Sequence, residues 1–129
     1  MATNTAGTDA RLYHQSMVHY LRKTVNYNDS GVASGVSMGT IPSGSVVIGV
    51  DVLVETAFSA DGVHVGVSGT PDKYVAAGDV TETSTGFTSV TANNDKVSAD
   101  TEILVTVAGT QSAGKATVIF RYAPDHTGA

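Results

Sequence analysis

The segment from Val46 to Phe58, VVIGVDVLVETAF, constrains the fold more than any other part of the chain. Every second residue from Val46 onward is apolar apart from one threonine, whereas the alternate positions include the carboxylates of Asp51 and Glu55. A period of two that is rich in β-branched residues indicates a strand with one buried face. The predicted inward set is Val46, Ile48, Val50, Val52, Val54, Thr56 and Phe58. The segment therefore predicts one long strand of a packed antiparallel sheet.

The composition limits how such a strand can be packed. A chain of 129 residues has the length of one domain. Its 14 glycines indicate short strands joined by tight turns. With 6% aromatic residues and no tryptophan, the core must consist mainly of aliphatic side chains. The absence of cysteine excludes disulfides, thiol chemistry and cysteine-ligated zinc.

The first half of the chain contains further strand and turn signals. Residues 11–27 fit either a helical or a strand spacing, and we favour a strand over about residues 18–27 because the run TVNYN is poor for a helix. A short strand is expected within residues 31–39, and residues 41–44 (IPSG) form a corner before the long strand. Residues 59–62 (SADG) predict a hairpin turn that brings residues 63–67 back beside the long strand.

The second half is predicted to contain a break followed by three or four strands. Residues 70–72 (TPD) interrupt the pattern, and residues 73–80 form either a short strand or a helical turn with Tyr74 and Val75 inward. Residues 83–92 form a strand around Phe87 and Val90.

The last two strands are the clearest of this half. One is built on alternating Ile103, Val105 and Val107, and the other on Ala116, Val118, Phe120 and Tyr122. Phe58, Phe87 and Phe120 are all expected in the core.

Seven to nine short strands with these turns predict an all-β, antiparallel β-sandwich. A jelly roll is the first expectation, because that double-sheet form protects most strand edges. An immunoglobulin-like strand order is the alternative, although its Cys–Trp–Cys signature is absent. The predicted organisation is a flexible arm over residues 1–14, one sandwich domain over residues 15–123 and a loose tail over residues 124–129.

Charge and hydropathy restrict the partners of this domain. Residues 1–40 carry a net charge of +1, whereas residues 41–129 carry four basic and ten acidic side chains, a net charge of −6. An acidic body argues against nucleic-acid binding, which requires neutralisation of phosphates. No apolar run is long enough for a membrane span, and the first 15 residues lack the apolar core of a signal peptide.

The residues with catalytic or metal-binding potential form no recognisable constellation. His14, His19, His64 and His126 show no metal-binding spacing, and the oxygen donors around residues 93–95 and 100–102 lack the order of a calcium loop. Asp51 and Glu55 lie about 13 Å apart along a strand, too far for a glycosidase pair. We therefore expect no enzyme activity, no catalytic residues, no metal and no cofactor.

One short segment of the arm is a candidate contact with a partner. Arg11, Leu12, Tyr13 and His14 place a cation, an aliphatic side chain and aromatic rings together. Arg and Tyr are enriched among residues that anchor protein interfaces. These four residues are therefore predicted to bind a partner protein.

Residues 39–58 (GTIPSGSVVIGVDVLVETAF) resemble a known group of phage proteins. These are small β-rich structural proteins encoded near the capsid genes of tailed bacteriophages, in which a Gly-x-Ile/Leu-Pro-x-Gly corner leads into a long Val-rich strand ending near Thr-Ala-Phe. Residues 63–69, 114–122 and 23–29 fit the same pattern as hairpin partner, last strand and first strand with its turn. The resemblance spans residues 20–123 and is greatest to jelly-roll cement, or decoration, proteins.

This resemblance implies a structural virion protein with no catalytic residues. It implies a protein that binds the outside of a phage capsid and bridges capsomers, with the major capsid protein and a second copy of itself, as a homodimer, for partners. Such a protein is made in the host cytoplasm and resides on the virion exterior. The alternative is a carbohydrate- or receptor-binding module of a phage fibre or tail, with Tyr13, Tyr20, Tyr27 and Tyr74 as candidate platforms and the lack of tryptophan against it.

Overall fold

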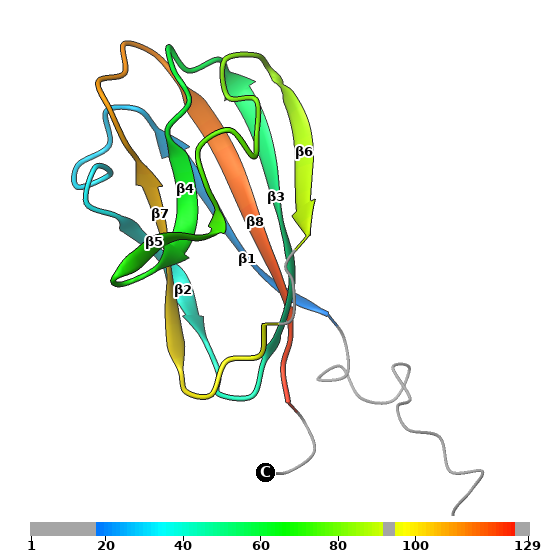
Figure 1. The fold of residues 1–129 in the computed structure, drawn as a ribbon. Helices are drawn as coiled ribbons and strands as arrows, with labels where there is room; N and C mark the ends of the chain where they lie inside the picture. The colour runs from blue at the N-terminus through cyan, green and yellow to red at the C-terminus, as the bar shows by residue number, and fades with distance from the viewer. Residues whose placement is uncertain (1–17, 92–94, 126–129) are drawn as a thin grey trace, which may run out of the picture.

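A computed structural model describes residues 18–91 and 95–125 of the chain and shows two four-stranded antiparallel sheets packed face to face (Figure 1). All regular structure in these residues is β-strand. The eight strands are β1 (His19–Asn26), β2 (Val36–Ile41), β3 (Val46–Thr56), β4 (Val63–Val67), β5 (Thr70–Val75), β6 (Gly86–Thr91), β7 (Thr101–Val107) and β8 (Lys115–Ala123). The predicted all-β sandwich is confirmed.

The strand order identifies the sandwich as a jelly roll. The first sheet has the order β1-β8-β3-β6 and the second the order β2-β7-β4-β5. The first and last strands are neighbours, and β4 and β5 are the one pair of consecutive strands in the same sheet. Every other connection between these strands crosses from one sheet to the other. An immunoglobulin domain instead pairs several consecutive strands within a sheet, so this order excludes the alternative fold.

The predicted hairpin between the long strand and residues 63–67 is wrong. The long strand β3 pairs with β8 and β6, whereas β4 lies in the second sheet between β7 and β5. Both strands have a valine-rich face, and placing them in opposite sheets lets the two faces bury each other. The Asp61-Gly62 segment therefore leads into a crossing between sheets, where the carbonyl of Gly62 accepts the amide of Ala108 at 2.8 Å.

The predicted break at residues 70–72 is also wrong, because these residues begin strand β5. Pro71 is tolerated there since β5 is an edge strand, where one backbone amide is not needed for pairing. The position of β5 depends on Gly66, because a Cβ at Gly66 would lie 2.3 Å from the carbonyl oxygen of Thr70. Residues 73–75 continue the strand without a helical turn, and Tyr74 and Val75 are buried as predicted.

Strand β3 follows the predicted alternation over only part of its length. Val50, Val52 and Val54 are buried, as expected. A bulge between Val47 and Gly49 shifts the register, however, so that Val47 is buried and Val46 is 45% exposed. A bulge adds one residue to a strand and thereby moves the side chains before it to the opposite face. The assignment of Val46 to the core is therefore wrong.

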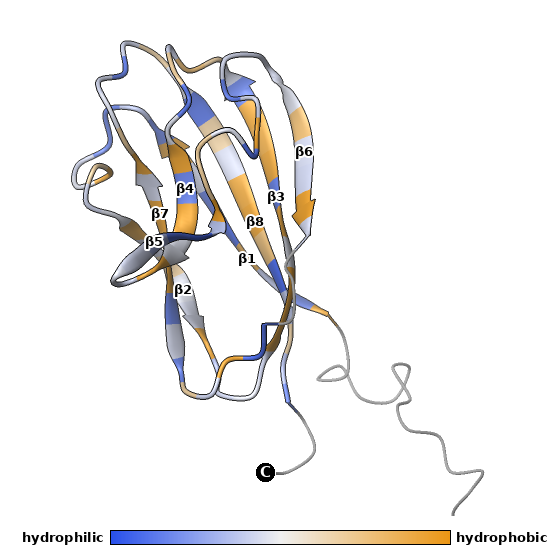
Figure 2. Cartoon of the chain, in the orientation of Figure 1, coloured by the Kyte–Doolittle hydropathy of each residue, from blue (hydrophilic) through white to orange (hydrophobic). Residues whose placement is uncertain are grey.

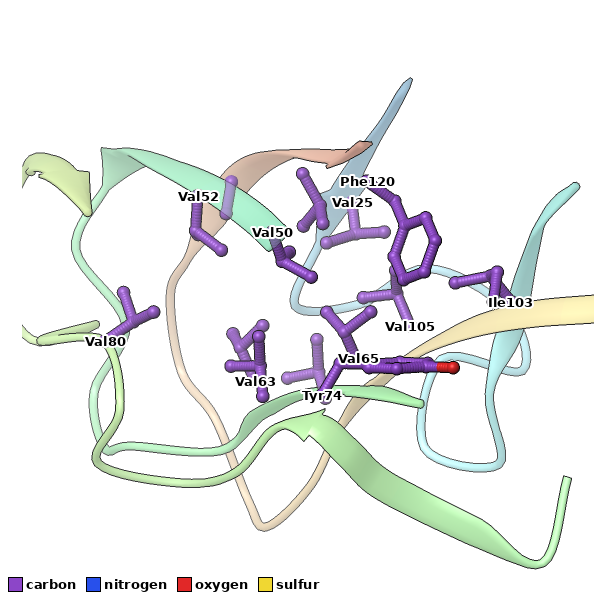
Figure 3. Packing of buried hydrophobic residues seen from close by; sticks show 14 of the residues in the cluster. Val25, Val50, Val52, Val63, Val65, Tyr74, Val80, Ile103, Val105 and Phe120 are labelled. Carbon is purple, nitrogen blue, oxygen red and sulfur yellow. The ribbon is translucent and has the colours of Figure 1, made fainter. Parts of the chain in front are cut away.

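The core lies between the two sheets and includes an aromatic contact that joins them. Phe120 on β8 meets Tyr74 on β5 edge to face, with ring centroids 5.1 Å apart, among valines of both sheets (Figure 3). Figure 2 shows hydrophobic residues recurring along the central strands β3, β4 and β8. Phe58 and Phe120 are buried as predicted, but Phe87 is 60% exposed. It lies on the outer face of the first sheet, opposite Leu53.

Two of the predicted chain segments fall largely outside the described residues. The proposed arm, residues 1–14, lies outside them entirely, and so does most of the proposed tail, since the description ends at Asp125. The division into arm, domain and tail therefore stays a prediction. The central domain itself extends across eight paired strands from His19 to Ala123.

Candidate interaction surface

The outer face of the first sheet presents a regular grid of side chains. Since successive residues of a strand point to opposite sides, the ladder registers place one residue from each of the four strands in every row of this face. The face consists of Tyr20, Arg22 and Thr24 on β1; Thr117, Ile119 and Arg121 on β8; Gly49, Asp51 and Leu53 on β3; and Phe87, Ser89 and Thr91 on β6.

A two-pronged ion pair lies at the centre of this face. The guanidinium of Arg121 donates from Nε to Oδ2 of Asp51 at 2.9 Å and from Nη2 to Oδ1 at 3.3 Å. The hydroxyl of Ser89 donates to the same Oδ1 at 2.6 Å. The Asp51 side chain is only 14% exposed. This network links β8, β3 and β6, and it leaves the negative charge of Asp51 compensated.

Gly49 makes room for this ion pair. A Cβ at Gly49 would lie 2.7 Å from the carbonyl oxygen of Val90 and 2.9 Å from Nη2 of Arg121. Both contacts are shorter than a real Cβ adopts, so a side chain at this position would displace the guanidinium or the β6 backbone. The glycine that follows the bulge therefore allows Arg121 to lie against the sheet and reach Asp51.

Two further polar pairs join neighbouring strands of this sheet. Lys115 Nζ lies 3.7 Å from Oε2 of Glu55, and the hydroxyls of Thr24 and Thr117 are 2.9 Å apart. Exposed ion pairs of this kind contribute little stability, typically up to about 1 kcal/mol. Their importance here is that Asp51 and Glu55 are both paired with cations on β8.

The same face carries exposed apolar side chains next to the paired charges. Leu53 is 40% exposed and Phe87 is 60% exposed, and the two lie directly opposite each other on β3 and β6. Tyr20, at the other side of the sheet, is 63% exposed. Exposed rings and aliphatic groups beside neutralised charges are typical of surfaces that bind other proteins. The Leu53–Phe87 pair is the apolar part of this face that lies at the β6 edge of the sheet.

A buried carboxyl outside this face was not identified from the sequence. Glu82, in the connection between β5 and β6, is fully buried, and its Oε1 accepts the amide of Val63 at 3.1 Å. Burial, together with the neighbouring carboxyl of Asp61, raises the pKa of Glu82 to about 7. A part-buried hydrogen bond from the Tyr74 hydroxyl to Asp95 is a further contact of a carboxylate, and burial and that carboxylate raise the pKa of Tyr74.

The residues selected from the sequence as partner-binding, Arg11, Leu12, Tyr13 and His14, lie outside the described residues. Their assignment stays a prediction. His14 and His126 lie outside as well, whereas His19 is on β1 and His64 on β4, in different sheets.

Residues 18–91 and 95–125 contain neither a metal-binding group of side chains nor a membrane-spanning helix. In these residues no three His, Cys, Asp or Glu side chains form a group that could hold a metal ion. They contain no helix that is long and apolar enough to cross a membrane.

The described tyrosines do not form one platform for a sugar. Tyr74 is buried in the core, where it contacts Phe120. Tyr20 and Tyr27 are exposed, but they are separated by seven residues along and just beyond β1, about 23 Å by the rise of a strand. A single pocket cannot use both rings. This arrangement disfavours a carbohydrate site built on these tyrosines.

No family model and no curated protein matches the chain. Three solved structures of phage capsids do contain a chain of similar fold. The capsid asymmetric unit of cyanophage Pam1 contains a chain with a TM-score of 0.60 and 19% identity, over 84% of this chain and 85% of that one. The capsid of Ralstonia phage GP4 contains a chain with a TM-score of 0.59 and 17% identity, over 86% of each chain.

The acidic stable capsid of Helicobacter pylori bacteriophage KHP30 gives a TM-score of 0.59 and 16% identity, over 83% of this chain and 87% of that one. Identities of 16–19% establish likeness of fold. The expected resemblance to jelly-roll proteins of phage capsids is confirmed at this level: the chain has a jelly-roll fold shared with chains of three phage capsids.

Proposed function

We propose that the protein is a structural component of a bacteriophage virion, a cement or decoration protein that binds the outside of the capsid and bridges capsomers. The observation that carries this proposal is the extent of the structural likeness. At least 83% of this chain matches at least 85% of a chain in each of three phage capsids. The likeness therefore extends over the whole domain of this chain and nearly the whole of each matched chain, and is not limited to one sheet within a larger protein.

The proposed partners are the major capsid protein and a second copy of this chain. A capsid offers many equivalent binding positions, so a protein with two linked attachment points binds far more tightly than either point alone. The mixed surface of the first sheet, with paired charges beside Leu53 and Phe87, suits contact with protein. The acidic chain, with its net charge of −5, supports a role without nucleic acid.

In this proposal the protein is not an enzyme and needs no cofactor. It is made in the host cytoplasm and resides on the virion exterior. The competing role is a receptor- or sugar-binding module of a tail or fibre, and the separation of Tyr20 and Tyr27 disfavours a sugar site built on these two rings. Gene order separates the two roles: a neighbouring major capsid gene supports the cement role, and neighbouring tail genes support the other.

The attachment test uses phage particles prepared without the protein. The full chain is expected to co-sediment with them, and a variant lacking residues 1–14 is expected to bind at least about tenfold more weakly. The reason is that this deletion removes the predicted anchors Arg11 and Tyr13, and loss of one anchor usually costs more than about 1.4 kcal/mol, a factor of ten. Deletion of residues 1–10 alone keeps the four predicted contact residues and serves as the matched control.

Circular dichroism should show that both truncated proteins melt at the temperature of the full chain, because β1 begins only at His19. Equal binding by all three proteins would remove the arm from the attachment mechanism. Failure of the full chain to bind the particles at all would contradict the cement role itself.

A further inference from the structure

The four sheet edges of this jelly roll are not equally protected against pairing with another chain. The edge strands are β1 and β6 in the first sheet and β2 and β5 in the second. Proteins block such edges with charged side chains, proline or bulges. Strand β1 carries Arg22 and Lys23, β5 contains the run Pro71-Asp72-Lys73, and β2 has a bulge between Ser37 and Gly39.

Strand β6 has none of these devices. Its sequence, GFTSVT, contains no charge and no proline, and its ladder with β3 runs without a register shift from Gly86 to Thr91. On the opposite side of the sandwich the edges β1 and β2 contact each other, whereas β5 makes its main contacts with β4, β3 and β7. Figure 1 shows β6 as the outermost strand of its sheet. This edge therefore offers a straight, uncharged row of backbone donors and acceptors.

The side chains beside the β6 edge suit contact with a second copy. Phe87 on β6 is 60% exposed and lies next to Leu53, which is 40% exposed. The nearest carboxylate on this face, Asp51, is neutralised by Arg121 and accepts a hydrogen bond from Ser89. Two copies with a net charge of −5 each repel one another overall. Contact through the β6 edge avoids this repulsion, because it brings together no unpaired charge of β3 or β6.

We propose that β6 pairs antiparallel with β6 of a second copy and forms a symmetric dimer with a continuous eight-stranded sheet. In an antiparallel ladder, directly opposed residues lie on the same face. In a symmetric dimer, the residue at the twofold axis therefore lies opposite the same residue of the other copy. The largest number of β6 residues can pair when this residue is Thr88 or Ser89, the two central residues of the strand. Either register places Phe87 beside Ser89 or Thr91 of the other copy and covers its ring.

This inference deepens the self-association within the proposed function, but its test uses the isolated full chain without particles. Light scattering coupled to chromatography at high micromolar concentration is expected to give the mass of a dimer. Phe87→Lys places a charge on the edge and in the apolar contact, and it should weaken the dimer at least tenfold. Thr40→Lys, at an exposed site on the β2 edge, is the matched control and should leave the dimer unchanged.

Cross-linking tests the register directly, since the chain has no cysteine of its own. Directly opposed residues have Cα atoms about 4.5–5.5 Å apart, within the range of a disulfide. Either Ser89→Cys or Thr88→Cys should form a disulfide-linked dimer under mild oxidation, and Thr40→Cys should not.

A monomeric wild type, a dimer insensitive to Phe87→Lys, or no cross-link from either β6 cysteine would overturn the proposed interface. These outcomes leave capsid attachment to be judged by the particle assay. The two proposals can therefore fail separately.

Discussion

Replacing Phe120 by alanine is expected to lower the free energy of unfolding by about 3–5 kcal/mol, the usual cost of deleting a buried phenylalanine ring. Phe120 has no exposed surface, and its ring joins β8 in the first sheet to Tyr74 in the second. With few aromatic residues in the chain, neighbouring aliphatic side chains cannot refill the space of a ring. A single domain with total stability of about 5–15 kcal/mol would be strongly affected.

The matched control is Phe87→Ala, which removes the same side chain from an exposed position. Its expected cost is under about 0.5 kcal/mol, measured by urea unfolding at a protein concentration where light scattering shows a monomer. This pair of variants also distinguishes the structure from the sequence pattern, which predicted both rings in the core. Equal losses of stability for Phe120→Ala and Phe87→Ala would contradict the packing of the two sheets.

The second large effect concerns the protonation of Glu82. Burial and the Asp61 carboxyl raise the pKa of Glu82 from 4.5 in its ordinary state to about 7 in the folded protein. The folded state therefore holds this proton more tightly than the unfolded state does. The contribution of Glu82 to the free energy of unfolding is therefore largest below pH 4.5. It decreases as the pH rises through 7 and does not change further at higher pH. One pKa unit corresponds to about 1.4 kcal/mol, so the loss is about 3 kcal/mol.

The variant Glu82→Gln tests this dependence. Glutamine keeps an oxygen that can accept the Val63 amide, and it presents an uncharged amide to Asp61 at every pH. We expect the variant to match the wild type near pH 4.5 and to be more stable by up to about 3 kcal/mol at pH 8. Glu102→Gln changes an exposed carboxyl of β7 and should keep the wild-type profile. Parallel stability–pH curves for Glu82→Gln and the wild type would show that Glu82 is not the responsible group.

The parts of the fold that could be predicted are those that depend on local alternation. Val50, Val52 and Val54 on β3, and Val118 and Phe120 on β8, are buried where a period of two placed them. Pairing could not be predicted in the same way, because a period of two gives the face of a strand but not its neighbour. In a jelly roll most consecutive strands belong to different sheets, so the expected hairpin after Phe58 was wrong.

The remaining misses share one physical cause, which is contact between residues distant in the sequence. Val46 and Phe87 have ordinary core side chains, but a bulge leaves Val46 exposed and a place on the outer face of the sheet leaves Phe87 exposed. Glu82 carries no signal of burial, since an isolated glutamate in a polar loop is usually solvated. Its burial requires the β4 amide of Val63 and the crossing segment before it. The ion pair of Arg121 with Asp51 likewise joins strands 70 residues apart.

The most direct test of the proposed function is a density map, at side-chain resolution, of the complete phage particle that is proposed to carry this chain. The cement role predicts density for the eight-stranded jelly roll on the outer surface of the capsid, in contact with more than one capsomer, with residues 11–14 ordered against a neighbouring protein. Density for the chain confined to the tail or fibres, or to the capsid interior, would contradict it.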